Sequence, residues 1–363
     1  MTMMMKTLLI LVGVVMIGLV ECSSGAPLVP AMFAFGDSII DCGNNNFLSS
    51  IAKANYLPYG IDFNGWPSGR FTNSRTIIDL LGEKMGLPYL PPYADPTTVG
   101  SRIIYGVNYA SAAAGVLDET GQHYGERFSL SQQVLNFENT LNELRYQIGG
   151  GANLTRYLAK SIAVLVLGSN DYINNYLLPT LYPTSQLYST SEFANLLLNH
   201  YTRQLLALHT LGLRKFFIAG VGPLGCIPNQ RGTGQAPPGR CLDYVNQMVG
   251  PFNQGLRALV DQLNSQHPGA IFAYGNTYGA VGDILNNPAV YGFSVVDRGC
   301  CGLINLQRIT CLPFSTPCPD RNQFVFWDAF HATQGVYAVL AHRAFVGPQN
   351  DCYPINVQQI TLL

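Results

Sequence analysis

Short apolar runs alternate with longer amphipathic segments along this sequence, and that alternation constrains the fold more than any other feature. The runs are four to six residues long, rich in β-branched or aromatic side chains, and each ends near a glycine. They occupy residues 32–35, 104–109, 162–167, 216–221 and 271–274. Strands that alternate with helices are typical of a parallel sheet covered on both faces. We therefore predict an α/β domain built on a central, mostly parallel sheet of five strands.

Helix start and stop signals lie between the apolar runs. The clearest predicted helix begins at the cap residue Asn73 and stops at Gly86, two residues before Pro88. Its apolar face consists of Ile77, Ile78, Leu81 and Met85. Further helices are predicted at residues 131–146, 191–211, 243–266 and 333–345. No repeat, linker or low-complexity tract interrupts the chain, so we predict that residues 26–363 form a single domain.

The first 25 residues have the features of a secretory signal peptide. A head with one charge, at Lys6, precedes thirteen apolar or glycine residues at 8–20 and a small polar group at 22–25. A membrane anchor would need about 20 apolar residues. No second long apolar run follows. We expect a secreted, extracellular protein without a membrane span once this segment is removed.

The cysteines support an oxidising compartment. Loss of Cys22 with the signal peptide would leave eight cysteines, an even set that is typical of disulfides in a secreted chain. Six of these eight lie between residues 226 and 318, so the disulfides should mostly hold loops in the second half. The order of the cysteines does not determine their pairing. The sequon at Asn153 predicts a glycan on an exposed loop after three glycines.

Charge and motif spacing exclude several classes of function. The 363 residues include 20 Lys plus Arg and 21 Asp plus Glu, and Arg214 with Lys215 is the only adjacent basic pair, so we predict no nucleic-acid partner. No Cys-x-x-Cys pair or His-Glu-x-x-His motif indicates zinc. Residues 220–225 fit G-x-G-x-x-G, but prolines and glycines follow where a dinucleotide site needs a helix. We therefore predict neither a cofactor nor a metal.

Polar residues follow three of the predicted strands. Ser38 comes after the first run, Gly115 ends the segment after the second, and Asn170 follows the third. Ligands of open parallel α/β sheets bind outside the carboxyl ends of the strands. These positions predict that a hydroxyl, a backbone amide and a carboxamide converge on one rim. Taken singly, each has an ordinary alternative as a helix cap, a tight turn or a loop cap.

A serine nucleophile needs a base, and His331 is the candidate among the six histidines. It lies three residues after Asp328 and just before a predicted helix, so an acid and an imidazole share one tight loop. A carboxylate so placed would fix the imidazole tautomer and stabilise the imidazolium. The other histidines lie inside helical patterns or in loops without an acid at a matching offset. Judged alone, Asp328 could equally be a turn or cap residue.

Together these residues resemble a known family. Residues 36–39, Gly-Asp-Ser-Ile, are similar to the Gly-Asp-Ser-Leu signature of the plant-type GDSL esterase/lipases in the SGNH hydrolase superfamily. The resemblance continues through residues 44–46, Gly115, 168–171, 222–228, 300–302, Asp328 and His331, and so spans essentially the whole mature chain. It implies a three-layer α/β/α, flavodoxin-like fold with a long insertion at about residues 43–102. Ile39 replaces the signature leucine, a volume-conserving change.

The resemblance also implies roles for the matching residues. Ser38 would be the nucleophile, and His331 the base supported by Asp328. The backbone N–H groups of Ser38 and Gly115 and the side-chain amide of Asn170 would form the oxyanion hole. Ala112 and Ala113 stand where many relatives carry glycines, which leaves Gly115 as the oxyanion candidate.

Two further hypotheses concern residues outside this set. Cys42 occupies a position that is often not cysteine in the family, and we predict an extra disulfide between Cys42 and Cys352. Four aromatic residues of the insertion could line an acyl or aryl groove or could simply pack the insertion onto the domain. They are Tyr56, Tyr59, Phe63 and Trp66.

The sequence thus predicts a secreted serine esterase or lipase that hydrolyses small-molecule or lipid-like carboxylic esters through an acyl-enzyme on Ser38. One alternative is an acyltransferase or transesterase acting on hydroxy-fatty acyl esters. Another is a catalytically silent protein of the same fold that binds a lipid or glycan. Retention of both a base and the acid that orients it argues against a binding role alone.

Overall fold

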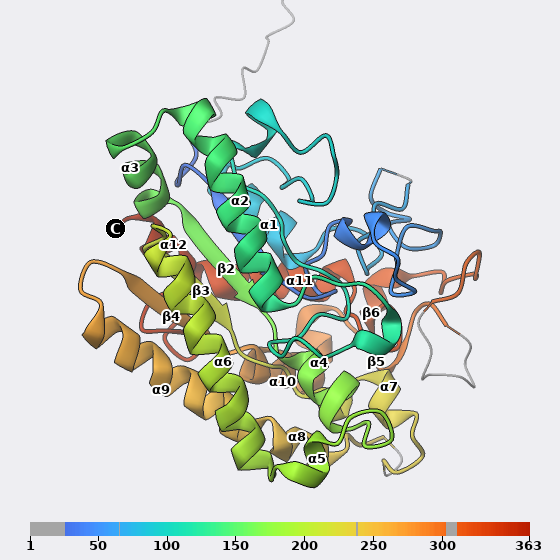
Figure 1. Cartoon of the computed structure of the whole chain (residues 1–363). Helices are drawn as coiled ribbons and strands as arrows, with labels where there is room; N and C mark the ends of the chain where they lie inside the picture. The colour runs from blue at the N-terminus through green and yellow to red at the C-terminus, as the bar shows by residue number, and fades with distance from the viewer. Residues whose placement is uncertain (1–25, 65, 237–238, 303–310) are drawn as a thin grey trace, which may run out of the picture.

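A central sheet organises the computed structural model, which describes residues 26–64, 66–236, 239–302 and 311–363 (Figure 1). The predicted signal peptide at residues 1–25 lies outside the described residues. Within them the main sheet has five strands, in the order β1-β2-β3-β4-β7. These are β1 (Met32–Gly36), β2 (Ile162–Val166), β3 (Lys215–Ala219), β4 (Ile271–Gly275) and β7 (Cys352–Tyr353). The first four are parallel and β7 is antiparallel to β4, so the predicted mostly parallel five-stranded sheet is confirmed.

One predicted strand is not a regular strand. Residues 104–109 run beside β1, where the amide of Ala34 donates to Val107 and the amide of Tyr109 donates to Ala34. The backbone bends at Gly106, whose φ is +113° and where a Cβ would lie 1.7 Å from the carbonyl oxygen of Met32. Only glycine permits this approach, and the bend interrupts the ladder. With this edge segment included, the chain crosses the sheet in the flavodoxin-like order 2-1-3-4-5.

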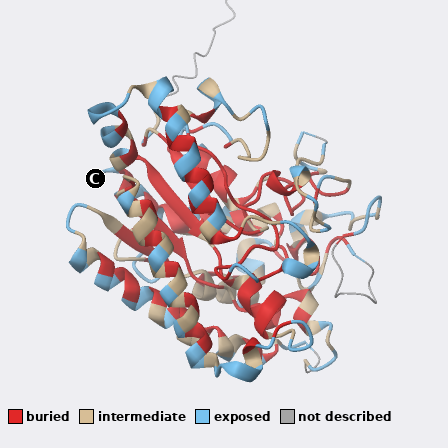
Figure 2. Cartoon of the chain, in the orientation of Figure 1, coloured by how far each residue is buried: buried red, intermediate tan, exposed pale blue. Residues whose placement is uncertain are grey.

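Helices cover both faces of the sheet, which confirms the predicted α/β fold. In Figure 1, α2 (Leu130–Ile148), α6 (Thr190–Thr210) and α9 (Gly250–Gln266) lie on the viewer's side of the sheet. The opposite layer contains α1 (Ile77–Met85), α10 (Thr277–Asn286) and α11 (Gln334–Val346). Phe137 of α2 packs against Phe33 of β1, with ring centroids 4.9 Å apart. Figure 2 shows that the strands of the main sheet are buried while the helices around it expose their outer faces.

Shorter elements decorate the connections between these layers. A second, two-stranded parallel sheet pairs β5 (Val295–Gly299) with β6 (Phe324–Phe326). The remaining helices are α3 (Ala152–Lys160), α4 (Ser169–Asp171), α5 (Thr184–Leu187), α7 (Pro228–Arg231), α8 (Asp243–Met248) and α12 (Val357–Thr361). No helix in the described part of the chain is long and apolar enough to cross a membrane.

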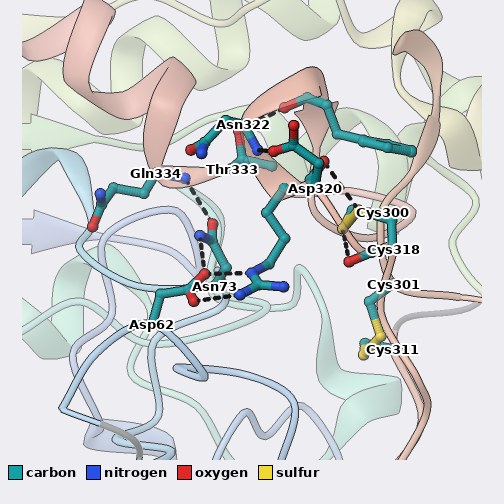
Figure 3. Close-up of a disulfide and its surroundings, with 12 residues drawn as sticks. Asp62, Asn73, Cys300, Cys301, Cys311, Cys318, Asp320, Asn322, Thr333 and Gln334 are labelled. Atoms are coloured by element: carbon teal, nitrogen blue, oxygen red, sulfur yellow. Dashed lines mark hydrogen bonds and ion pairs between the residues drawn. A yellow bond between two sulfur atoms is a disulfide. The ribbon is translucent and has the colours of Figure 1, made fainter.

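Two helix boundaries differ from the sequence prediction. Helix α1 is capped by Thr76, whose side chain accepts from the Asp79 amide while Asp79 accepts from the Thr76 amide. Asn73 lies outside the helix and instead links Asp62 to the amide of Gln334 at the start of α11 (Figure 3). The predicted helix at 243–266 is divided into α8 and α9, because Pro251 lies in the first turn of the second helix and cannot continue the first.

Three disulfides hold loops in the second half of the chain, as predicted. They are Cys226–Cys241, Cys300–Cys318 and Cys301–Cys311, the last two of which lie side by side in Figure 3.

The predicted disulfide between Cys42 and Cys352 is wrong, because both thiols are free and buried. Cys42 follows β1 and donates to the carbonyl of Leu90, whereas Cys352 lies in β7 and contacts the carbonyl of Ala344. The two strands are at opposite ends of the sheet, four strand spacings or about 19 Å apart.

Candidate active site

Ser38 lies in a tight turn at the carboxyl end of β1. The turn begins at Asp37, whose backbone amide donates to Val166 of the neighbouring strand and whose carbonyl accepts from the amide of Asp41. A side chain at Gly36 would meet Ile40 at 2.5 Å, so glycine is required for the chain to turn this sharply. The half-buried serine is therefore held on the rim of the sheet, in the place where α/β folds bind ligands.

His331 and Asp328 share the loop between β6 and α11. His331 Nε2 lies 2.8 Å from Ser38 Oγ. Its other ring nitrogen, Nδ1, lies 2.8 Å and 2.9 Å from the two carboxylate oxygens of Asp328. The backbone amide of Trp327 donates to the carbonyl of His331 and closes the loop. The structure thus brings a hydroxyl, an imidazole and a carboxylate into one hydrogen-bonded chain.

The carboxylate of Asp328 is fully buried and accepts several hydrogen bonds. One oxygen accepts from the backbone amides of Phe330 and His331, and the other accepts from the Tyr59 hydroxyl at 2.5 Å. Burial alone would raise the pKa of Asp328, but the charge of His331 and these hydrogen bonds hold the pKa below its usual value. Asp328 is therefore ionised at neutral pH and can stabilise a protonated imidazole.

Tyr59 is a site residue whose position was not anticipated from the sequence. It belongs to the 43–102 insertion, is fully buried, and lies 269 residues before the acid that it contacts. Its ring packs against Phe71 and Trp327. Among the four aromatic residues considered for a groove, Tyr56 and Tyr59 pack the insertion onto the disulfide-linked loops, and Trp66 is 76% exposed. The packing interpretation therefore holds for these two tyrosines.

Asn170 is the second residue of the short helix α4, which follows β2 at the same rim. Its side-chain nitrogen donates to the carbonyl of Ala114 at 2.9 Å, and its oxygen accepts from Asn174 at 2.7 Å. These two contacts fix which end of the amide carries the hydrogens. Asn170 lines the same cavity as Ser38 and His331.

In the turn that follows the edge segment at 104–109, Ala113 borders the cavity and Gly115 does not. Ala112 and Ala113 line the cavity, and Ala113 has a left-handed φ of +65°. Gly115 is not among the lining residues. A Cβ at Gly115 would lie 2.4 Å from the Thr120 methyl and 2.5 Å from Asp171, so close packing behind the turn requires glycine there.

Two buried acids hold the loops that form this rim. Asp171 accepts from the amides of Val116 and Leu117, and burial raises its pKa to about 6 despite these hydrogen bonds. Asp41 accepts from the amides of Gly43 and Ala112, and burial likewise raises its pKa to about 6. Each carboxylate therefore organises backbone that would otherwise be unpaired.

A third buried acid, Asp37, lies next to the serine. One of its oxygens accepts from the amide of Ile39 at 3.0 Å, while the other has no hydrogen-bond partner among the described residues. Burial raises the pKa of Asp37 to about 7, although the Ile39 amide and the charge of His331 act in the opposite direction. Burial therefore favours the neutral form of this carboxyl.

A cavity of about 330 Å³ opens beside the serine and is lined mainly by apolar side chains. This volume is within the range of small-molecule sites. Ser38, Asn170 and His331 contribute its polar end, and Phe71 and Ile173 lie among the apolar residues around them. Across the described ranges, no group of three or more His, Cys, Asp and Glu side chains is arranged to hold a metal ion.

The predicted glycosylation residue lies outside these loops, in α3. Asn153 is exposed, but it occupies the first turn of α3 rather than the predicted loop. The helix begins at Ala152, directly after the three glycines, and the Thr155 hydroxyl donates to the carbonyl of Gly151. The sequon is thus on the surface of a helix.

Comparison with known proteins gives consistent matches over this whole region. The family described as GDSL-like Lipase/Acylhydrolase matches residues 32–344. A GDSL esterase/lipase of Arabidopsis thaliana is 63% identical over 94% of this chain and 92% of its own length. A second from the same plant is 53% identical over 97% of this chain and 93% of its own. GDSL esterase/lipase 7 of Arabidopsis thaliana is 47% identical over 99% of this chain and 100% of its own length.

Proposed function

The chain belongs to the GDSL-like lipase and acylhydrolase family and is an ester-bond hydrolase, and from this premise we propose that it cleaves carboxylic esters through an acyl-enzyme on Ser38. The observation that carries the proposal is the unbroken hydrogen-bonded chain from Ser38 through His331 to Asp328. A serine hydroxyl is a poor nucleophile unless a base of this kind removes its proton.

In the proposed mechanism His331 Nε2 takes the proton from Ser38 Oγ as the oxygen attacks the ester carbonyl carbon. Asp328 keeps the remaining ring proton on Nδ1 and stabilises the imidazolium that forms. The imidazolium then gives its proton to the departing alcohol, which leaves the acyl group on Ser38. His331 next deprotonates a water molecule, whose attack releases the acid and restores the serine.

The oxyanion of each tetrahedral intermediate needs donors that are already in place. We assign these to the backbone amide of Ser38, the side-chain amide of Asn170 and an amide of the 112–115 turn. The family resemblance points to Gly115 for the third donor. The cavity lining favours Ala113, since that residue borders the substrate space and Gly115 packs behind it.

We also propose that the protein is secreted, with residues 1–25 as the signal peptide and a glycan on Asn153. Three disulfides support this, because structural disulfides persist in oxidising compartments. The exposure of Asn153 supports modification. Expression in a secretory host should give a mature N-terminus near residue 26, and Asn153→Gln should abolish the mobility shift caused by endoglycosidase. Retention of residues 1–25 would contradict the proposal.

Hydrolysis of p-nitrophenyl esters tests the catalytic proposal. Wild-type protein should release p-nitrophenol, and Ser38→Ala should lower kcat by about 10⁴-fold or more. Ser191→Ala is a matched control, because Ser191 is exposed on α6 and lies outside the cavity lining. Turnover by Ser38→Ala equal to that of the wild type would refute the acyl-enzyme on this residue.

A further inference from the structure

The cavity beside Ser38 extends well beyond the reacting groups. It passes between the sheet and the layer of α1, α10 and α11, and reaches Cys352 of β7. Strands β2, β3 and β4 separate Ser38, at the end of β1, from β7. That span is four strand spacings, or about 19 Å. A volume of about 330 Å³ distributed over this length forms a long, narrow channel.

Apolar side chains of both layers line the channel. The sheet contributes Val164 and Phe217, which are 1% and 3% exposed, and α1 contributes Leu81, which is fully buried. Helix α11 contributes Val336 and Leu340 from the side opposite the sheet. The channel therefore lies in the interior of the protein, with apolar surface on both sides along most of its length.

Small residues create the space. Ala219 of β3, Ala280 of α10 and Ala344 of α11 all face the channel. Gly275 of β4 also lines it, but a Cβ there would lie 2.5 Å from the Phe217 ring, so the absent side chain makes room for that ring. Protein interiors normally fill such positions with interdigitating large side chains and leave few voids larger than a water molecule. Alanines from three elements that meet along one channel indicate space kept for a ligand.

The two ends of the channel differ in chemistry. At one end are Ser38 and His331, with the exposed side chain of Ile51 at the mouth. At the other end Arg343 pairs with Asp351 at 2.5 Å and with Asp283 at 2.7 Å. An apolar chain that entered past the serine would be stopped at this ion pair, because burying it without water is unfavourable.

We propose that this channel holds the acyl chain of the substrate, which makes the protein selective for esters of long, unbranched fatty acids. The inference rests on the proposed function of Ser38 and adds the substrate class. The ester carbonyl lies at Ser38, the chain runs beneath β2, β3 and β4, and the alcohol faces the mouth. A branched or ring-bearing acyl group would not fit between the sheet and α11.

The test compares p-nitrophenyl octanoate with p-nitrophenyl hexadecanoate. An Ala344→Trp side chain would fill the far end of the channel. The ratio of kcat/KM for hexadecanoate over octanoate should then fall about 50-fold, the effect of displacing roughly three methylene groups. Ala338→Trp is the matched control, since Ala338 is exposed on the same helix, and it should change the ratio by less than about twofold.

A second variant keeps the test valid if Ala344→Trp does not fold. Ala280→Leu narrows the same channel from α10 and should lower the ratio in the same direction, with thermal unfolding close to that of the wild type. Unchanged ratios in the folded channel variants would overturn the acyl channel while leaving Ser38 catalysis intact. Wild-type protein that turned over neither ester would overturn the proposed function, and the channel assignment with it.

Discussion

The hydroxyl of Tyr59 donates a 2.5 Å hydrogen bond to the Asp328 carboxylate, which joins the 43–102 insertion to the acid of the proposed triad. Both side chains are buried, at 0% exposure. Burial raises the pKa of Tyr59 well above its usual value, and the charge of Asp328 raises it further. The tyrosine is therefore a hydrogen-bond donor at neutral pH. The insertion thus contacts the acid of the proposed triad directly.

We expect Tyr59→Phe to lower kcat about tenfold, because the carboxylate loses one charge-assisted hydrogen bond and holds the imidazole less firmly. KM should change little, since Tyr59 does not line the cavity. Steady-state kinetics with a p-nitrophenyl ester measure both constants. Tyr56→Phe is the control: Tyr56 donates to the backbone carbonyl of Cys311, and its loss should leave kcat within about twofold. Equal kcat values for the two variants would show that the contact with Asp328 has no catalytic effect.

Asn170→Ala should lower kcat by about 10² to 10³, the usual cost of one oxyanion donor, with a small effect on KM. Asn174→Ala is the variant to compare with Asn170→Ala, because the Asn174 side chain donates to the side-chain oxygen of Asn170 and orients it. That variant should lose less activity, since the Asn170 amide would remain in the cavity. Wild-type kcat in folded Asn170→Ala would mean that the oxyanion is stabilised by backbone amides alone.

The raised pKa of Asp37 predicts that stability falls as pH rises. The pKa is 3.8 for the unconstrained side chain and about 7 in the folded protein. Between these values the folded state binds more protons than the unfolded state, so the free energy of unfolding decreases with pH. This one group contributes a slope of about 1.4 kcal/mol per pH unit between pH 4 and 7.

Asp37→Asn removes this titration, and urea unfolding at several pH values measures the change. The variant should show a shallower decline in the free energy of unfolding across pH 4 to 7 than the wild type. Asp297→Asn is the control, because the Asp297 side chain is 46% exposed, and it should follow the wild-type curve. If Asp37→Asn also followed that curve, the carboxyl would not be protonated in the folded state at these pH values.

The fold was predictable because local patterns agree with the global arrangement. Each inner strand is a short apolar run that ends at the rim, and the parallel topology follows from the helices between them. The segment at 104–109 has the same composition but fails to form a strand, because Gly106 must pass within contact of the β1 backbone. Such an approach depends on tertiary structure, which periodicity along the chain does not report.

The proposed site also contains residues that the sequence could indicate and residues that it could not. Ser38, Asn170 and the loop of Asp328 and His331 could be named because strand ends converge and because an acid three residues before a histidine is visible in the sequence. Tyr59 carries no such local signal, since its partner lies 269 residues away. Likewise, the position of Cys42 and Cys352 at opposite ends of the sheet could not be read from cysteine spacing.

Covalent labelling of the serine tests the central claim most directly. A fluorophosphonate reacts with an activated serine, and tandem mass spectrometry of the digested protein locates the adduct. We predict a single adduct on Ser38 in the wild type, no adduct in Ser38→Ala, and much slower labelling in His331→Ala. An adduct on another residue, or an unlabelled Ser38 in folded wild-type protein, would contradict the account.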